Sequence, residues 1–568
     1  MSASCPSKPE TLSIGVPPTS WVSKVIITKI SKQSPRFCYI CNMKRICPLA
    51  FLAPLPLLSC STGQAPGKPN IILFLVDDYG WTDSSVQYDG QLYPYNLRFE
   101  TPNMQKLADM GVVMSNAYAC PVSTPTRVCM MSGMNAAHIK ITNFTSLEKD
   151  KPSDAIGGAP GSVNPNLSDE FANPEWNHNG ICPVACRPDS ARYGLNHTAY
   201  ITPMVQLLAD AGYFTVHAGK AHWAPAGTPG TNPYNYGFSV NIAGGSNGHP
   251  KSYLGSDNYG NTKELWDLAA IQNMVEYYGT GVNLTEALTL EALKALEYPV
   301  RHNQPFYLYM SHHGTHTPIQ GDERFVGKYL EAGMSGKEAR YASMVESIDW
   351  SLGEILRWLE DKGIADNTVI LFMSDNGGQS VGGAKGGEDH TQNLPLREGK
   401  ASVYEGGIRV PMIFWWPGRT TARREAGFAM PEDIFPTILD IAGVRDYSTE
   451  QPVDGISLLP TFLEGKSPER DVIFHYPHQW RVEDQEDIDF LSSIRRGDWK
   501  LVYRMHGGTV ELYNLKEDIG ERHDLSASQP GLVHELARAL SDRLREWGAS
   551  MPVVRSTGKA VPMPDEVL

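Results

Sequence analysis

The sequence predicts an α/β fold: a large mixed, mostly parallel sheet between layers of helices, followed by a smaller C-terminal α+β subdomain. Three observations support this prediction. Two unbroken apolar runs, residues 70–80 and 367–378, each end abruptly in acidic and amide residues. Residues 337–362 repeat apolar side chains at helical spacing. Beyond residue 468 the pattern changes to alternating strands and one amphipathic helix.

The two apolar runs read NIILFLVDDYG and NTVILFMSDNGG. A strand that is apolar on both faces is buried on both faces, as in a parallel sheet covered by helices. Further strands are expected at residues 305–313 and 410–418. Alternation of strands with helices indicates a mostly parallel sheet. Because ligands gather at the carboxyl ends of such strands, the acidic residues mark a predicted site.

The expected helix at 337–362 carries its apolar positions on one face: Met344, Ile348, Leu352, Ile355 and Leu359. Residues 143–260 are rich in glycine, asparagine and proline and are expected to form long loops over the cleft.

The C-terminal region has a different pattern. Residues 493–504 and 510–518 alternate like antiparallel strands, and residues 532–548 form an expected amphipathic helix. We therefore expect a catalytic domain at 69–467 and a C-terminal subdomain at 468–568.

The composition is that of a globular protein. The chain has 568 residues, of which 41% are hydrophobic and 20% charged, enough for a full core. Its formal net charge of −14 argues against nucleic acid as a partner, which needs a broad basic surface. Small anions stay possible substrates, because a few cations inside a cleft can overcome an acidic exterior.

Residues 43–60, MKRICPLAFLAPLPLLSC, have the features of an export signal. A basic start precedes an apolar run too short to span a bilayer comfortably. The end resembles a bacterial lipobox, which predicts an exported protein whose membrane anchor is a lipid on Cys60, facing the periplasm or in the outer membrane. A plain cleaved signal or a coincidental apolar stretch is the alternative. Because a signal should begin a chain, residues 1–42 are expected to be a spurious extension, and 61–68 a tether.

Four cysteines would remain in the mature chain besides the anchor: Cys120, Cys129, Cys182 and Cys186. The last two either form a small disulfide in an oxidising compartment or stay free. A zinc site is disfavoured, because no second pair of cysteines or histidines has matching spacing.

Asp77, Asp78, Asp375 and Asn376 end the two apolar strands. Their oxygens suit a hard cation such as Ca²⁺ or Mg²⁺. Adjacent carboxylates repel each other unless something positive lies between them. Either pair alone is more simply explained as a helix cap or a turn. Together, after matching strands, they favour a metal site.

A short motif at residues 123–127, Ser-Thr-Pro-Thr-Arg, is followed by Ser132 and Gly133. It resembles the Cys/Ser-x-Pro-x-Arg signature of the type I, formylglycine-dependent sulfatases, a family with the alkaline-phosphatase-like fold. Cys120 does not begin the pattern, because Val122 stands where proline is required. The resemblance therefore implies that a sulfatase-maturing enzyme of the radical, bacterial type converts Ser123 to formylglycine.

The resemblance also implies the chemistry. The formylglycine aldehyde is hydrated, and one of its hydroxyls attacks sulfur. Deprotonation of the other hydroxyl then expels sulfate and restores the aldehyde. An unmodified serine would instead leave an ester that needs hydrolysis.

Other elements resemble the same family in the same order, from residue 69 to about 460. HAGKAHW supplies Lys220 and His222, SHHGTHTP supplies His316, and REGKASVYEGGIRVP supplies Lys400. An extra residue near Gly314 keeps His313 as an alternative to His316.

The family implies a role for each matching residue. One Ca²⁺ is bound by Asp77, Asp78, Ser123 as formylglycine, Asp375 and Asn376. The sulfuryl oxygens are neutralised by Arg127, Lys220 and Lys400. His316, with Lys400, protonates the departing sugar oxygen, and His222 takes the proton from the second hydroxyl. Asp375 helps to activate the nucleophile.

The expected substrate is a sulfated carbohydrate, such as a glycosaminoglycan, mucin or algal polysaccharide. We favour exo action on galactose or N-acetylgalactosamine sulfate. His478 and Trp480, in residues 475–480, are candidate sugar contacts, with a structural role as the alternative.

Two other functions are weighed. A phosphomonoesterase, phosphodiesterase or phosphonate hydrolase of the same superfamily would need two zinc ions, and no second complete ligand set is found. A catalytically inactive glycan-binding relative would result if Ser123 were never oxidised.

Overall fold

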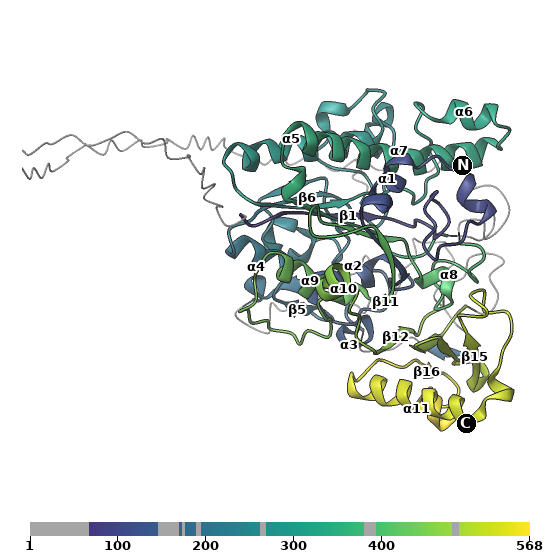
Figure 1. The fold of residues 1–568 in the computed structure, drawn as a ribbon. Helices are drawn as coiled ribbons and strands as arrows, with labels where there is room; N and C mark the ends of the chain where they lie inside the picture. Colours follow the sequence, from purple (N-terminus) through teal and green to yellow (C-terminus); the bar gives the residue numbers. More distant parts are fainter. Residues whose placement is uncertain are drawn as a thin grey trace, which may run out of the picture. The chain divides into compact units, whose positions relative to one another are not determined.

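An eight-stranded sheet forms the centre of the structure, a computed structural model of the chain (Figure 1). It describes residues 67–145, 170–172, 177–188, 195–261, 268–379, 393–479 and 488–568. The export signal, Cys60 and the tether up to residue 66 lie outside these ranges, as does Trp480. Within them, no helix is both long and apolar enough to cross a bilayer.

The sheet is mixed but mostly parallel. Only β10 runs antiparallel to its two neighbours, and every other adjacent pair is parallel. In spatial order the strands are β11 (Arg423–Ala429), β2 (Val112–Ala117), β10 (Met412–Trp415), β9 (Thr368–Ser374), β1 (Asn70–Val76), β8 (Phe306–Ser311), β6 (Phe214–Gly219) and β7 (Val240–Ile242).

Strand β1 shows why its sequence is apolar throughout. Ile72 and Phe74 face one hydrophobic core, whereas Ile71 and Leu73 face a second core on the opposite side of the sheet. All seven of its residues are buried. The prediction of a doubly covered central strand is confirmed.

Helices cover both faces of the sheet (Figure 1). One core is closed by α1 (Pro102–Met110), α5 (Leu284–Arg301) and α7 (Gly336–Asp361), with α6 (Val326–Glu331) against α7. The other is closed by α2 (Ser123–Ser132), α4 (Met204–Asp210), α9 (Ile434–Ile441) and α10 (Leu459–Glu464).

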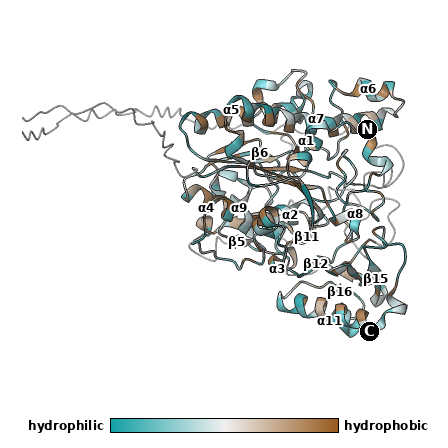
Figure 2. Cartoon of the chain, in the orientation of Figure 1, coloured by the Kyte–Doolittle hydropathy of each residue, from teal (hydrophilic) through white to brown (hydrophobic). Residues whose placement is uncertain are grey.

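Helix α7 is the helix predicted at residues 337–362. All five of its predicted apolar positions, from Met344 to Leu359, lie in the first core. Figure 2 shows hydrophobic and hydrophilic segments mixed along α5 and α7, as expected for helices with one face on a core.

The C-terminal region forms a separate antiparallel sheet of β12 (Asp471–Tyr476), β13 (Leu491–Arg496), β14 (Trp499–Arg504) and β15 (Thr509–Asn514). Helix α11 (Pro530–Glu546) packs on one face through Leu536 and Leu540. Residues of the other face, such as Val502, join a core with Tyr118 and Val122. The predicted fold class, including this subdomain, is confirmed.

The prediction of loops across residues 143–260 is wrong in part. This region supplies α4 and two strands of the main sheet, β6 and β7, as well as a small parallel pair, β4 (Ile181–Pro183) with β5 (Ala199–Ile201). Strand β6 is short and contains polar residues, and its burial comes from β8 and α5 rather than from a long apolar run.

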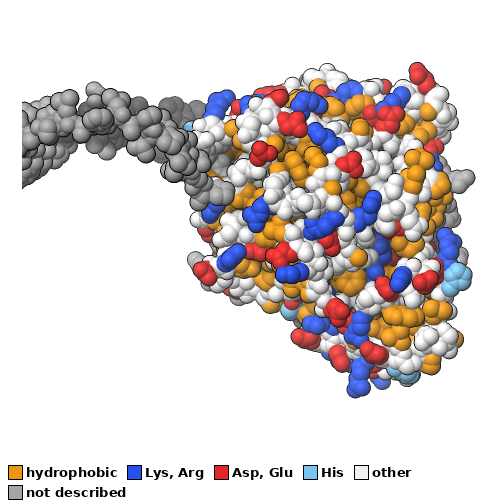
Figure 3. Space-filling model, in the orientation of Figure 1, with side chains coloured by type: hydrophobic (Ala, Val, Ile, Leu, Met, Phe, Trp, Pro, Cys, Tyr) orange, Lys and Arg blue, Asp and Glu red, His pale blue; other side chains and the backbone are white. Residues whose placement is uncertain are grey.

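The remaining elements are short. They are α3 (Ala136–Ile139), α8 (Glu405–Ile408), and a three-stranded sheet of β3 (Phe171–Ala172), β16 (Val553–Val554) and β17 (Lys559–Ala560). Cys120, Cys129, Cys182 and Cys186 carry free thiols. Charges of both signs are interspersed on the face shown in Figure 3.

Candidate active site

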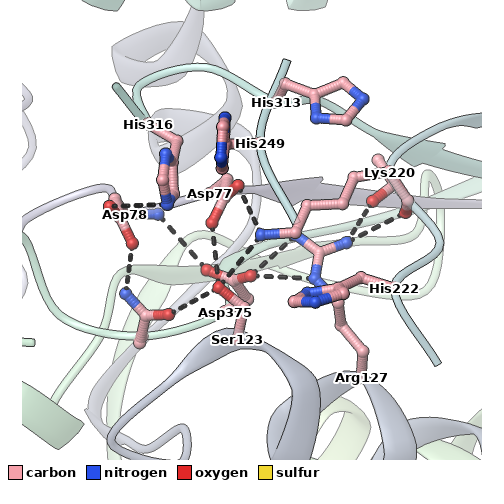
Figure 4. Close-up of polar contacts among 12 residues, drawn as sticks. Asp77, Asp78, Ser123, Arg127, Lys220, His222, His249, His313, His316 and Asp375 are labelled. Atoms are coloured by element: carbon pink, nitrogen blue, oxygen red, sulfur yellow. Dashed lines mark hydrogen bonds and ion pairs between the residues drawn. The ribbon is translucent and has the colours of Figure 1, made fainter. Parts of the chain in front are cut away.

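Four adjacent parallel strands end at the same edge of the sheet. Their order is β9, β1, β8 and β6, and the segments that follow them carry the predicted site residues. Asp77 follows β1, Asp375 follows β9, Lys220 follows β6, and His316 follows β8. The topology therefore brings together residues that are far apart in the sequence (Figure 4).

Ser123 is the first residue of α2 and lies at the centre of this group. Its Oγ is 3.1 Å from Asp77 Oδ1 and 3.1 Å from Asn376 Oδ1. Lys220 Nζ donates to the same Oγ at 3.1 Å. The N-terminus of a helix favours negative charge, so an oxyanion at position 123 would be stabilised there.

Three carboxylates crowd together beside Ser123. Asp77, Asp78 and Asp375 are fully buried, and one oxygen of each lies within 4.8 Å of the others. Burial, and then the negative charge of Asp77, raise the pKa of Asp375. Such crowding is unfavourable without positive charge among the oxygens. Together with the Asn376 amide oxygen, this donor set fits a hard divalent cation.

Protein cations surround the carboxylates. Lys220 Nζ lies 2.7 Å from Asp77 Oδ2, and Lys400 Nζ lies 2.7 Å from Asp78 Oδ1. Burial lowers the pKa of Lys220, although Asp77 opposes this. Burial also acts to lower the pKa of Lys400, but the charges of Asp78 and Asp77 outweigh it, and the pKa is raised.

Arg127 has a different place from the one expected. It is fully buried, and its Nε donates to Asp375 Oδ2 at 2.9 Å. Its Nη1 donates to the Lys220 carbonyl oxygen at 3.1 Å and also to Ser311 Oγ. Arg127 does not line the pocket over Ser123. Its guanidinium thus positions Asp375 and the segment that carries Lys220.

The geometry distinguishes between His316 and His313, the two candidates for the same site position. His316 lines the pocket, and its Nε2 lies 3.8 Å from Asp78 Oδ2. Its Nδ1–H donates to the Thr317 carbonyl oxygen at 2.9 Å. His313 is buried outside the pocket lining and has no drawn contact to the cluster (Figure 4). Burial, followed by the charge of Lys400, holds the pKa of His316 well below its ordinary value.

His222 lies on the other side of Ser123. Its Nδ1 is 3.2 Å from the hydroxyl of Thr124, the residue after Ser123. Burial and the nearby Lys220 charge hold the pKa of His222 well below its ordinary value. The lowered pKa favours the neutral ring, in which one nitrogen is free to act as an acceptor.

A pocket of about 620 Å³ opens over these residues, a typical size for a small-ligand site. Ser123, Lys220, His222, His316 and Lys400 form one part of its wall. The rest of the wall includes Phe144, Thr145, Ser246, Asn247, Gly248, His249 and Lys251. All of them lie in residues 143–260, the region expected to contribute loops over the cleft, although the sequence did not single out these residues individually.

His478 does not reach the pocket. It is fully buried, and its Nε2 lies 2.7 Å from Thr142 Oγ1. Because His478 is absent from the pocket lining, the structure does not support the predicted sugar contact. Its contacts instead pack the segment after α3 against the C-terminal sheet. The reason is that β12 directs this segment inward, which its sequence did not reveal.

Comparison with known proteins matches the chain to the family that its sequence motifs resemble. The Sulfatase family model matches residues 69–171 and 189–444, and the model for the C-terminal region of N-sulphoglucosamine sulphohydrolase matches residues 399–549. A sulfatase of Formosa agariphila is 28% identical over 550 residues, covering 87% of this chain and 91% of that protein. Human N-acetylgalactosamine-6-sulfatase is 30% identical over 510 residues, covering 84% and 85%.

Among solved structures, Ps i-CgsB in complex with k-i-k-neocarrahexaose superposes with a TM-score of 0.62 at 26% identity, covering 84% of this chain and 93% of that one. The fold and the cluster at the strand ends define a hydrolase of the alkaline phosphatase superfamily. Within that superfamily, the chain belongs to the sulfatase family and is a sulfuric ester hydrolase.

Proposed function

We propose that this enzyme removes sulfate from sulfated carbohydrates and that Ser123, converted to formylglycine, is its nucleophile. The observation that carries the proposal is the position of Ser123 Oγ. It lies 3.1 Å from each of Asp77 Oδ1, Asn376 Oδ1 and Lys220 Nζ, at the start of a helix and at the floor of the pocket.

The buried carboxylate cluster would hold one Ca²⁺. Its ligands would be Asp77, Asp78, Asp375, Asn376 and residue 123 itself. When bound, the ion supplies Lewis-acid polarisation of a sulfate oxygen. Formylglycine supplies a hydrated aldehyde with one hydroxyl to attack sulfur and a second to release sulfate.

Lys220 and Lys400 bind the sulfate group from two sides. Both line the pocket, and their ammonium groups pair with different carboxylates, Asp77 and Asp78. Their positive charges are fixed before substrate arrives, so they stabilise the charge that builds on the sulfuryl oxygens without reorganisation. Arg127 supports them indirectly by holding Asp375.

Two histidines handle protons on opposite sides of the nucleophile. His222 is neutral and lies beside residue 124, so it can take the proton from the second hydroxyl. His316 presents Nε2 to the pocket because its Nδ1–H is held by the Thr317 carbonyl. A bound sulfate favours the protonated ring, since an opposite charge stabilises imidazolium. His316, together with Lys400, then protonates the departing sugar oxygen.

The substrate class follows from the relatives and the pocket together. The curated relatives include N-acetylgalactosamine-6-sulfatases, and a similar solved structure contains a carrageenan oligosaccharide. We therefore propose a sulfated galactose or N-acetylgalactosamine residue. Exo action stays a prediction.

Three further features belong to the proposal. The chain is exported and anchored by a lipid on Cys60, in the periplasm or outer membrane. A sulfatase-maturing enzyme acts on Ser123. The catalytic domain spans 69–467, and the C-terminal subdomain, 468–568, supports it through the core that contains Val122.

The test is a desulfation screen of protein made together with a radical-type maturing enzyme. Mass spectrometry of the peptide that contains Ser123 should show a loss of two hydrogens. The same protein should release sulfate from at least one sulfated galactose or N-acetylgalactosamine and contain one calcium per chain. Two zinc ions per chain and turnover of phosphate esters would contradict the proposal. Protein whose Ser123 stays unmodified in the presence of the maturing enzyme, and which binds sulfated sugars without turnover, would be an inactive glycan-binding relative.

A further inference from the structure

A short loop, residues 244–251, forms part of the wall of the pocket. It follows β7 and supplies Ser246, Asn247, Gly248, His249 and Lys251 to the pocket wall. None of these residues belongs to the matched sulfatase motifs described above.

The loop is held firmly in place. The side chain of Asn241 accepts from Gly244 N at 3.0 Å and donates to Gly244 O at 3.1 Å. His222 N donates to Gly245 O at 3.0 Å, and Lys251 N donates to Ala269 O at 2.7 Å. Hydrogen bonds therefore hold the loop at both ends, and a further one joins it to the segment that contains His222.

Gly248 lets the loop approach the catalytic histidine. A Cβ at this position would lie 2.7 Å from His222 Cε1 and 3.0 Å from its Nε2, too close for any side chain without movement. This contact fixes where the neighbouring residue, Asn247, lies relative to the catalytic group.

Asn247 is buried, with 9% of its surface exposed, and its Nδ2 has no acceptor among the residues that the structure describes. A buried amide donor without a partner is unfavourable and rare. Asn247 also lines the pocket, so a turn of its amide toward the pocket would let a ligand supply the missing acceptor.

A second hollow, of about 270 Å³, lies on the far side of Asn247. It shares Ala226, Ser246, Asn247 and Leu268 with the main pocket. Its other walls include Thr231, Asn232 and Gln272, and the described residues that line it bear no charge. None of the catalytic residues lines it, so a substrate group that entered this hollow would lie beyond the sulfate group.

We propose that Asn247 is a specificity-determining residue that donates its side-chain amide to an uncharged oxygen of the sulfated sugar. The acceptor is either a ring hydroxyl or the carbonyl oxygen of an acetamido group, and the neutral hollow takes this part of the sugar. The inference rests on the proposed function, because it needs a sugar sulfate in the pocket.

The test measures binding to protein with Ser123→Ala, which makes it independent of maturation. Isothermal titration calorimetry gives the affinity for sulfated galactose and for N-acetylgalactosamine sulfated at the same position. Each affinity is compared between the Ser123→Ala protein and the same protein that also carries Asn247→Leu. Leucine keeps the number and branching of the side-chain heavy atoms but removes the donor. We expect affinity for the sugar sulfate to fall about tenfold, the size of one hydrogen bond, while affinity for inorganic sulfate stays within about twofold.

Asn241→Ala is the matched control, because the Asn241 amide is already satisfied by Gly244 in the same loop. Loss of that support should weaken sugar sulfate and inorganic sulfate alike by moving the loop. If Asn247→Leu behaves in the same way, or leaves sugar binding unchanged, the inference is overturned and the proposed function survives.

The two sugars identify the acceptor. A loss confined to the acetamido sugar assigns the carbonyl oxygen, whereas an equal loss for both assigns a hydroxyl. If Ser123→Ala protein binds inorganic sulfate but no sulfated sugar, both the inference and the carbohydrate part of the proposed function fail. In matured enzyme, Asn247→Leu should raise KM for the sugar sulfate but not for a simple aryl sulfate.

Discussion

The same short segment of chain supplies a buried charge to two different clusters. Lys400 joins the carboxylates at the strand ends, and Glu405, in α8, joins a network with the C-terminal sheet. In that network Glu405 lies 2.8 Å from Lys500 and 2.6 Å from Arg409. Lys500 also lies 2.8 Å from Glu521, and all these side chains are buried.

The two clusters differ in balance and in access. Burial alone would raise the pKa of Glu405, but Lys500, Arg409 and Arg495 outweigh it and hold the pKa below its ordinary value. In the same network, burial and the charge of Glu405 raise the pKa of Glu521 to about 7, and at the strand ends burial and a like charge also raise the pKa of Asp375. That cluster also opens to the pocket through Ser123 and Lys400. Buried charge by itself therefore does not mark an active site, whereas crowded like charges beside a pocket do.

The largest effect should come from the nucleophile. Ser123→Ala should lower kcat/KM by roughly 10 000-fold or more, because the converted side chain carries the covalent chemistry. The free energy of unfolding should change by less than about 1 kcal/mol, since a single hydroxyl is removed. Desulfation assays and denaturant unfolding measure both quantities.

Ser132→Ala is the control for this prediction. Ser132 lies on the same helix, and its Oγ donates only within α2, to the Val128 carbonyl. It should keep normal turnover. Substantial turnover by the Ser123→Ala protein would remove the assignment of the nucleophile.

Removal of the metal should have the next largest effect on turnover. It should act through the strand-end cluster and not through the network of Glu405 and Lys500. A chelator should abolish turnover, because Lewis-acid stabilisation is worth several kcal/mol, and added Ca²⁺ should restore it. Calcium at 100 times its Kd should also raise the free energy of unfolding by about 2.7 kcal/mol. A calcium-independent unfolding midpoint together with calcium-independent turnover would show that the carboxylates hold no ion.

The C-terminal network should respond in stability instead. Lys500→Met leaves Glu405 and Glu521 buried with less positive charge, which should lower the free energy of unfolding by about 3–5 kcal/mol. KM should stay near normal in the folded fraction. Lys294→Met is the matched control: this lysine pairs with Glu276 at the surface, and its loss should leave the free energy of unfolding almost unchanged. An equal loss of stability in the two variants would contradict the distinction between the buried network and a surface ion pair.

A third buried carboxylate, Asp349, sharpens the comparison because no cation pairs with it among the described residues. It accepts from Asn103 N at 3.1 Å and Met104 N at 2.7 Å at the start of α1. Burial raises its pKa to about 6. The folded state therefore binds the proton more tightly than the unfolded state, and stability from this group is present at low pH and lost as pH rises toward 6.

The measurement is the difference in unfolding free energy between wild type and Asp349→Asn at several pH values. That difference should fall by up to about 3 kcal/mol between pH 4 and 6 and then stay level. A difference that is flat across this range would show that the Asp349 pKa is not raised.

Parts of the molecule that depend on short-range pattern were predictable from the sequence. The apolar run of β1 and the acidic residues after it predicted a buried strand with a site at its carboxyl end. The helical spacing of apolar residues in α7 predicted which face of this helix is buried. Lys220, His316 and Lys400 were found through motif resemblance, and the structure brings them to one pocket.

What could not be predicted depends on contacts between distant segments. Strand β6 is buried by its neighbours rather than by its composition, so its region was expected to be loops. Arg127 matches the motif, but only the fold shows that its donors are used by Asp375 and Lys220. Asn247 carries no pattern at all, because its significance comes from Gly248 packing on His222.

The depth of Ser123 constrains the order of events during biosynthesis. Only 3% of its surface is exposed in the folded chain, which leaves room for a small substrate group but not for the catalytic cleft of another protein. An enzyme that modifies this residue must therefore work on a newly made chain, before α2 packs between the sheet and α9. Folding speed and the supply of that enzyme would then decide together how many molecules become active.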